Sequence, residues 1–153
     1  MPCDCEFISE GLRHGVGVNK PQDALAWIAP AETLALRLRD TLRYAEVLGW
    51  KGAYHVQRRT YAEAEAVLQQ AIRLVETVGA QPSLLYAVLW RRWGIVAHDQ
   101  MRYEIALERY RRGLQLLEEL GLLEHPDYAI TLNNLALLYR DQGRYREAES
   151  LYL

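Results

Sequence analysis

Few residues of this sequence have a type and spacing suited to catalysis or metal binding. Cys3, Cys5 and His14 offer three zinc ligands, but a fourth is missing and the spacing matches no standard zinc finger. The segment 15–18, Gly-Val-Gly-Val, lacks the third glycine and the preceding strand of a dinucleotide-binding motif. A nucleophile elbow, a zinc-protease motif and a phosphate-binding loop are also missing from the sequence. We therefore predict no catalytic residue, no metal site and no cofactor, and hence a protein that is not an enzyme.

Other side chains suit binding better than catalysis. The adjacent Arg91 and Arg92 could form paired hydrogen bonds with a carboxylate, unless they belong to a solvated face. The adjacent Asn133 and Asn134 could hydrogen-bond a peptide backbone, or instead cap loops and cross-link helices. Trp50 offers a large aromatic contact. These residues can act together only if the fold brings them to one surface.

The composition limits the fold that can position them. The chain has 153 residues, 50% of them hydrophobic and 25% charged, with a net charge of -2, which describes one folded domain of ordinary size. Leucine and alanine dominate while β-branched residues are few, so we predict an all-α fold.

Composition also narrows the partners and the location. No apolar run approaches the roughly 20 residues of a membrane-spanning helix, so no membrane partner is expected. The first ten residues lack the basic-then-apolar order of a secretory signal, which favours a cytoplasmic protein. Nucleic-acid binding is not expected, despite the cluster of Arg109, Arg111 and Arg112, because the net charge is negative.

A period of 42 residues organises the sequence. Tyr61, Tyr103 and Tyr145 stand at this interval, and an alanine follows each of them three residues later. Three further columns repeat with the same spacing: a large residue (Leu68, Tyr110, Tyr152), a small one (Gly52, Gly94, Ala136) and a large apolar one (Leu48, Trp90, Leu132).

Within each period the columns predict two helices that pack as a pair. Spacings of three, four and seven residues place the side chains on one face of a helix. A small residue such as Gly94 opposite Ala106 lets the two helices approach closely, and the neighbouring aromatic ring fills the remaining gap. Gly143 suits a left-handed residue in the turn between two helices. Arg59 and Met101 hold the equivalent place, so we expect those turns to close differently.

Capping and turn signals set the expected boundaries. The predicted helices span about 41–57, 61–78, 82–99, 103–120, 126–141 and 145 to the last residue. Pro30 should kink or split a further helix near residues 21–39. We therefore expect a flexible tail (1–20), a degenerate half-repeat (21–40) and three repeats (about 41–81, 82–124 and 125–153, the last truncated).

The third repeat resembles a tetratricopeptide repeat. It holds His-Pro-Asp-Tyr-Ala at 125–129, Leu-Asn-Asn-Leu-Ala-Leu-Leu-Tyr at 132–139 and Gly-Arg-Tyr-Arg-Glu-Ala-Glu-Ser-Leu-Tyr at 143–152. More narrowly, it is similar to the 42-residue variety of kinesin light chains and of bacterial multi-repeat signalling proteins. The likeness is close in the third repeat, fair in the second and loose in the first. It implies a right-handed superhelix, a solenoid of antiparallel helix pairs whose first helices line the inner wall.

The resemblance also implies a function. The protein is expected to be a non-catalytic interaction module that binds a peptide or a partner helix in a concave groove. The alternative is a fragment of the sensor or regulatory arm of a larger bacterial signalling ATPase or transcription regulator. The paired arginines favour an acidic partner, and the early end of the last helix predicts self-association through its apolar face. The groove residues carried over from the family are Trp50, Arg91, Arg92, Ile95, His98, Asn133, Asn134, Leu137 and Arg140.

Overall fold

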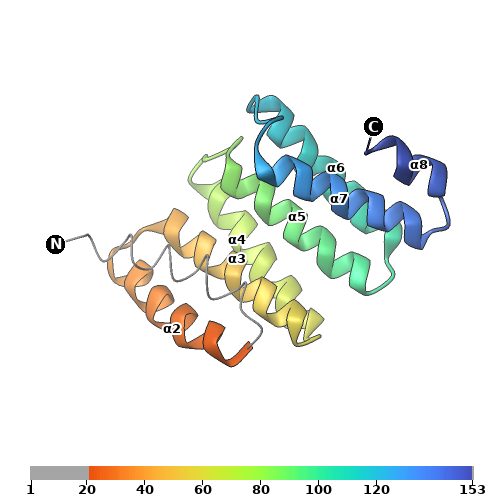
Figure 1. Cartoon of the computed structure of the whole chain (residues 1–153). Helices are drawn as coiled ribbons and strands as arrows, with labels where there is room; N and C mark the ends of the chain where they lie inside the picture. The colour runs from red at the N-terminus through yellow and green to blue at the C-terminus, as the bar shows by residue number, and fades with distance from the viewer. Residues whose placement is uncertain (1–20, 153) are drawn as a thin grey trace. The chain divides into compact units, whose positions relative to one another are not determined.

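The computed structural model describes residues 21–152 (Figure 1). The predicted tail, with Cys3, Cys5 and His14, lies outside the described residues. Within them the chain forms seven α-helices and no strand, which confirms the all-α fold. The chain divides into two compact units, Met1–Val78 and Gly79–Leu153, and each is described by itself.

The first unit contains helices α2 (Pro21–Arg37), α3 (Thr41–Gln57) and α4 (Tyr61–Thr77). Helix α2 buries a stripe of Ala24, Ile28, Ala31 and Ala35, and it packs against α3, which in turn packs against α4. Asp40 caps α3 by accepting a hydrogen bond from the backbone N–H of Arg43 at 2.9 Å. The starts of α3 and α4 agree with the sequence-based boundaries.

Helix α2 is not split at Pro30, contrary to one of the two outcomes expected from the sequence. Pro30 lacks an N–H, so the carbonyl of Ala26 loses its helical hydrogen bond. Both residues lie on the exposed side of α2. Water can therefore hydrogen-bond the freed carbonyl, and the helix continues through the proline.

The second unit contains α5 (Leu84–Asp99), α6 (Tyr103–Glu119), α7 (Pro126–Asp141) and α8 (Tyr145–Ser150). Helix α5 begins two residues later than predicted because Ser83, rather than Pro82, provides the cap: the Ser83 hydroxyl accepts from the N–H of Tyr86 at 3.3 Å. Helix α6 packs against both α5 and α7, and α8 packs against α7. The core of this unit includes Tyr110, Leu135 and Leu138.

The helices of a pair approach closely at the predicted small residues. An added Cβ at Gly94 would lie 2.6 Å from two ring atoms of Tyr110, and one at Gly52 would lie 2.6 Å from Leu68 Cγ. Such distances are shorter than van der Waals contact, so a larger side chain would have to displace its neighbour. The pairing of a small column with a large one is thereby confirmed for these two helix pairs.

The turns within the helix pairs all close in the same way, so the expectation for Arg59 and Met101 was wrong. Both residues adopt the left-handed conformation with φ of 59°, as Gly143 does with φ of 75°. In each turn this residue donates to the carbonyl three residues earlier, at 2.9, 2.8 and 2.9 Å respectively. The following residue donates to the carbonyl five residues earlier, at 3.0, 2.9 and 2.8 Å. These bonds satisfy the last helical carbonyls and offset the strain of a left-handed side-chain-bearing residue.

Candidate binding surface

The second unit brings most of the predicted site residues onto two neighbouring helices. Helices α5 and α7 contact each other directly and run side by side in Figure 1. We call their shared face the α5–α7 surface and define it by Arg91, Arg92, Ile95, His98, Asn134, Leu137 and Arg140. Trp50 belongs to α3 in the first unit, where it is half-buried and packs against the cluster of Ala24, Ile28 and Tyr54.

Arg91 links the middle of α5 to the first turn of α7. Its Nη2 lies 2.8 Å from Asp127 Oδ1, and the two side chains are 13% and 21% exposed. The other oxygen of Asp127 lies 3.4 Å from Nδ1 of His125, the residue that caps α7. Arg91 is therefore held by a carboxylate of its own chain.

His98 makes a second link between α5 and α7. Its Nε2 lies 3.0 Å from Asp141 Oδ2, and its Nδ1 lies 3.3 Å from the hydroxyl of Tyr110 on α6. Because a carboxylate only accepts, Nε2 donates to Asp141, and the neutral ring then accepts at Nδ1 from Tyr110. Burial raises the pKa of the Tyr110 hydroxyl well above its usual value, so this donor keeps its proton. The imidazole thus joins three helices.

The two links position the residues that lie between them. Ile95 on α5 and Leu137 on α7 are both half-buried, and each lies between the two linking residues in its helix. Arg140, whose side chain is 60% exposed, lies 3.4 Å from Asp141. The α5–α7 surface therefore has an aliphatic middle with an ion pair at each end.

The two asparagines face different surroundings. Asn133 is exposed, and its Oδ1 accepts a hydrogen bond of 2.8 Å from the hydroxyl of Tyr152, beyond the end of α8. Asn134 is half-buried, and its Nδ2 is buried with no hydrogen-bond partner among the described residues. The pair predicted from the sequence is thus divided, and Asn134 alone belongs to the α5–α7 surface.

Two functional partners were not predicted from the sequence: Asp127, which pairs with Arg91, and Asp141, which accepts from His98. A signal was present for one of them: His98 and Asp141 are 43 residues apart, close to one period of 42, whereas Arg91 and Asp127 are 36 residues apart. Both partners lie on α7, the first helix of the repeat that follows α5.

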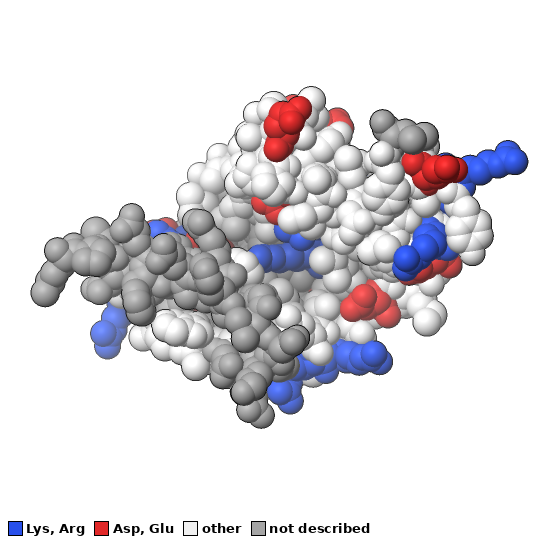
Figure 2. Space-filling model, viewed as in Figure 1, with Lys and Arg blue, Asp and Glu red and all other residues white. Residues whose placement is uncertain are grey.

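Few charged side chains lie on the α7 part of the α5–α7 surface. Between Tyr128 and Tyr139 helix α7 has no charged residue. Figure 2, seen as in Figure 1, shows the side that carries α7 as mostly uncharged, with a few isolated charges of both signs. This side of the second unit therefore attracts neither strong anions nor strong cations.

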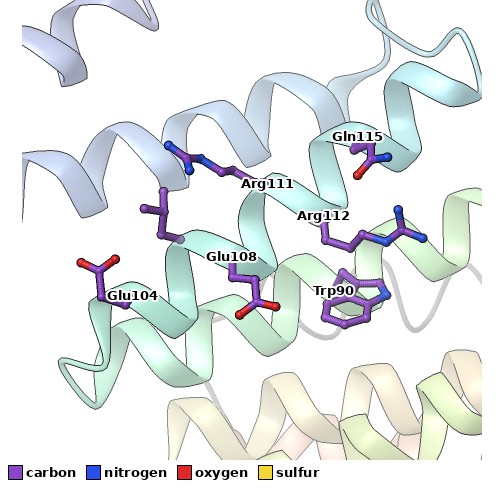
Figure 3. A pocket seen from close by; sticks show the side chains of 7 residues that line it. Trp90, Glu104, Glu108, Arg111, Arg112 and Gln115 are labelled. Carbon is purple, nitrogen blue, oxygen red and sulfur yellow. The ribbon is translucent and has the colours of Figure 1, made fainter.

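A hollow of about 570 Å³ lies along α6. Figure 3 shows Glu104 and Glu108 toward one end and Arg112 with Gln115 toward the other, above Trp90. Arg111 donates to the Tyr139 hydroxyl at 3.1 Å and thereby braces α6 against α7. The hollow is wide and lined by solvated charges of both signs, and its geometry indicates no particular ligand.

The three arginines that made up the candidate basic cluster do not act as one patch. Arg109 is buried, donates to the carbonyl of Trp93 at 2.9 Å and stacks 3.8 Å above the indole ring of that residue. The ring of Trp93 in turn lies 5.2 Å from that of Trp90. Arg109 is thus part of the packing between α5 and α6.

Within residues 21–152 no three histidine, cysteine or acidic side chains are grouped so as to hold a metal ion. None of the helices described above has the length and apolar character needed to cross a membrane.

Comparison with known proteins agrees with this architecture. Residues 85–153 match the sequence model of the tetratricopeptide repeat family. Among the 26 chains of solved structures that match the fold is BtubC (BKLC) from P. vanneervenii, with a TM-score of 0.69 and 21% sequence identity. The match covers 92% of this chain and 54% of that one, so the chain spans about half the length of BtubC. No curated protein matches in sequence.

The class of protein follows from these findings. The fold is all-α and built of helical hairpins, and residues 85–153 within the second unit carry the tetratricopeptide repeat pattern, in agreement with the resemblance seen in the sequence. Repeats of this family generally mediate protein–protein interaction and typically serve as scaffolds without catalytic activity.

Proposed function

We propose that this protein is a non-catalytic interaction module that binds an extended peptide or a partner helix along the α5–α7 surface. The main support is Asn134. Its buried Nδ2 lacks a hydrogen-bond partner among the described residues, and an unmet buried donor costs about 1–3 kcal/mol. A carbonyl of a bound backbone would satisfy this donor once the side chain turned toward it. Ile95 and Leu137, both half-buried, supply the apolar contact beside it.

The proposal is tested by selecting binders from a phage-displayed library of random peptides. We expect peptides with affinities near the micromolar range, typical of a single short segment. Leu137→Asp should weaken these peptides by about tenfold or more, because it places a charge in the aliphatic contact. Gln115→Asp, on the exposed side of α6, is the matched control and should leave the affinities unchanged. Circular dichroism melting checks that both variants fold.

Two results would reject this function. The first is a library that yields no peptide above background. The second is equal binding to wild type, Leu137→Asp and Gln115→Asp, because the contact would then lie elsewhere on the protein.

We also propose three further properties of the protein. They are a division of the chain into a half-repeat and three repeats, a cytoplasmic location, and self-association near α8. The exposed rings of Tyr145 and Tyr152, 68% and 62% accessible, support the last of these. Light scattering at increasing protein concentration tests it, since a constant monomer mass would argue against self-association.

The α5–α7 surface could serve equally in the regulatory arm of a larger signalling ATPase or transcription regulator. In that setting the same first helices would receive the ligand and pass the signal to other domains. A nucleotide-binding motif in the adjoining reading frame would favour this alternative, and further repeats alone would favour a stand-alone adaptor.

A further inference from the structure

Two arginines of the α5–α7 surface, Arg91 and Arg140, lie beside acids of the same chain, and the neutral imidazole of His98 donates to one of these acids. Arg91 is paired with Asp127 at 2.8 Å, and His98 is hydrogen-bonded to Asp141 at 3.0 Å. Arg140 also lies 3.4 Å from Asp141. An acidic partner, as expected from two neighbouring arginines, would therefore have to displace Asp127 from Arg91 before gaining a comparable contact.

The rest of the exposed surface on α7 is uncharged. No charged residue occurs between Tyr128 and Tyr139, and Ile130 in this stretch is 44% exposed. Leu137 is half-buried one turn before Arg140. A charged partner side chain would lose hydration here without an opposite charge to replace it, whereas an apolar one would release water.

Building on the function proposed above, we infer that the α5–α7 surface selects a peptide segment without net charge, anchored by aliphatic or aromatic side chains. Asp127 and Asp141 are the residues that determine this preference, because they neutralise Arg91 and Arg140 within the protein. Removing either acid exposes a cation and shifts the preference toward acidic peptides.

The experiment uses the full chain and a displayed library of random peptides about twelve residues long. Wild-type protein should select sequences with apolar anchors and few acidic residues. One selected neutral peptide and a second version carrying two glutamates are then synthesised, and their affinities are measured by fluorescence anisotropy. We expect the acidic version to bind wild type at least about fivefold more weakly.

Asp127→Asn should reduce or reverse the difference in affinity between the neutral and the acidic peptide, because it frees Arg91. Glu124→Gln is the matched control: it changes the net charge equally, lies three residues earlier and is exposed, so it should preserve the wild-type preference. If Asp127→Asn fails to fold, Asp141→Asn replaces it, since the Asp141 side chain is 40% exposed and its loss should be tolerated.

Each outcome supports or overturns the inference. Neutral selected peptides together with a shifted preference in the aspartate variant support it. Acid-rich peptides selected by wild type overturn the neutral preference while leaving peptide binding intact. An unchanged preference in the folded aspartate variants overturns the role of the paired acids. Failure to select any peptide rejects the proposed function, and this inference with it.

Discussion

Replacing Met101 by glycine should stabilise the second unit, although it removes a large apolar side chain. Met101 lies in the turn between α5 and α6 with φ of 59°, a conformation that costs an L-residue about 1–2 kcal/mol. Its side chain is 75% exposed, so little apolar burial is lost on truncation. Glycine adopts the same conformation without strain.

The expected gain follows from two opposing effects. Relief of the left-handed strain contributes about 1–2 kcal/mol, and the greater freedom of glycine in the unfolded chain removes about 0.5–1 kcal/mol. The net increase in the free energy of unfolding should be about 0.5–1 kcal/mol. Urea denaturation followed by circular dichroism measures it, and the slope of the transition should stay unchanged.

Two control variants separate this effect from other consequences of substitution. Gly143→Ala should destabilise by about 0.5–1 kcal/mol, because φ is 75° and nothing lies within 4 Å of the added Cβ, so the same strain and entropy effects act with the opposite sign and no steric clash is added. Leu123→Gly, at an exposed loop residue outside the left-handed region, should also destabilise. A loss of stability in Met101→Gly equal to that of Leu123→Gly would refute the assignment of strain to this turn.

Two further predictions concern the helix pairs. Gly94→Ala should lower the free energy of unfolding by about 1–2 kcal/mol, because the new Cβ meets the buried Tyr110 ring at 2.6 Å and this outweighs the gain in helix propensity; a stabilised variant in urea denaturation would contradict it. Burial lowers the pKa of His55 below 6.5, so the unfolded chain takes up a proton before the folded chain does as the pH falls. Stability should therefore decrease as the pH falls from about 7 through the folded-state pKa, and less so in His55→Asn; an imidazole pKa above 6.5 in a nuclear magnetic resonance titration would contradict this.

The fold was predictable because the 42-residue period constrains several columns at once. The small column at Gly52 and Gly94 and the large column at Leu68 and Tyr110 must match in size wherever two helices touch. In the third repeat Ala136 stands in the small column, and Tyr152, which holds the place of Tyr110, is 62% exposed. The added methyl group of Ala136 is therefore tolerated where no large ring packs on it.

Local signals were less reliable where tertiary structure overrides residue preference. Arg59 and Met101 would ordinarily disfavour the left-handed region, yet the paired helices on both sides dictate the same turn that glycine makes at residue 143. Pro30 would ordinarily interrupt a helix, but its place on the exposed side of α2 leaves the affected carbonyl accessible to water. In both cases the packing of the surrounding helices determines the backbone conformation. The residue type determines only how much free energy that conformation costs.

The charged residues of the α5–α7 surface do not recur with the 42-residue period. For this reason the period predicted the fold better than it predicted the candidate site. One period before Arg91 and His98 stand Gly49 and Val56, neither of which can form an ion pair. The links from α5 to Asp127 and Asp141 are therefore not a general property of the repeated helices. A search for acids about one period after the polar residues of α5 would have found Asp141 for His98, but not Asp127, which lies 36 residues after Arg91. Because Asp127 and Asp141 neutralise Arg91 and Arg140, replacing either acid should change which partner binds while the helices keep their packing.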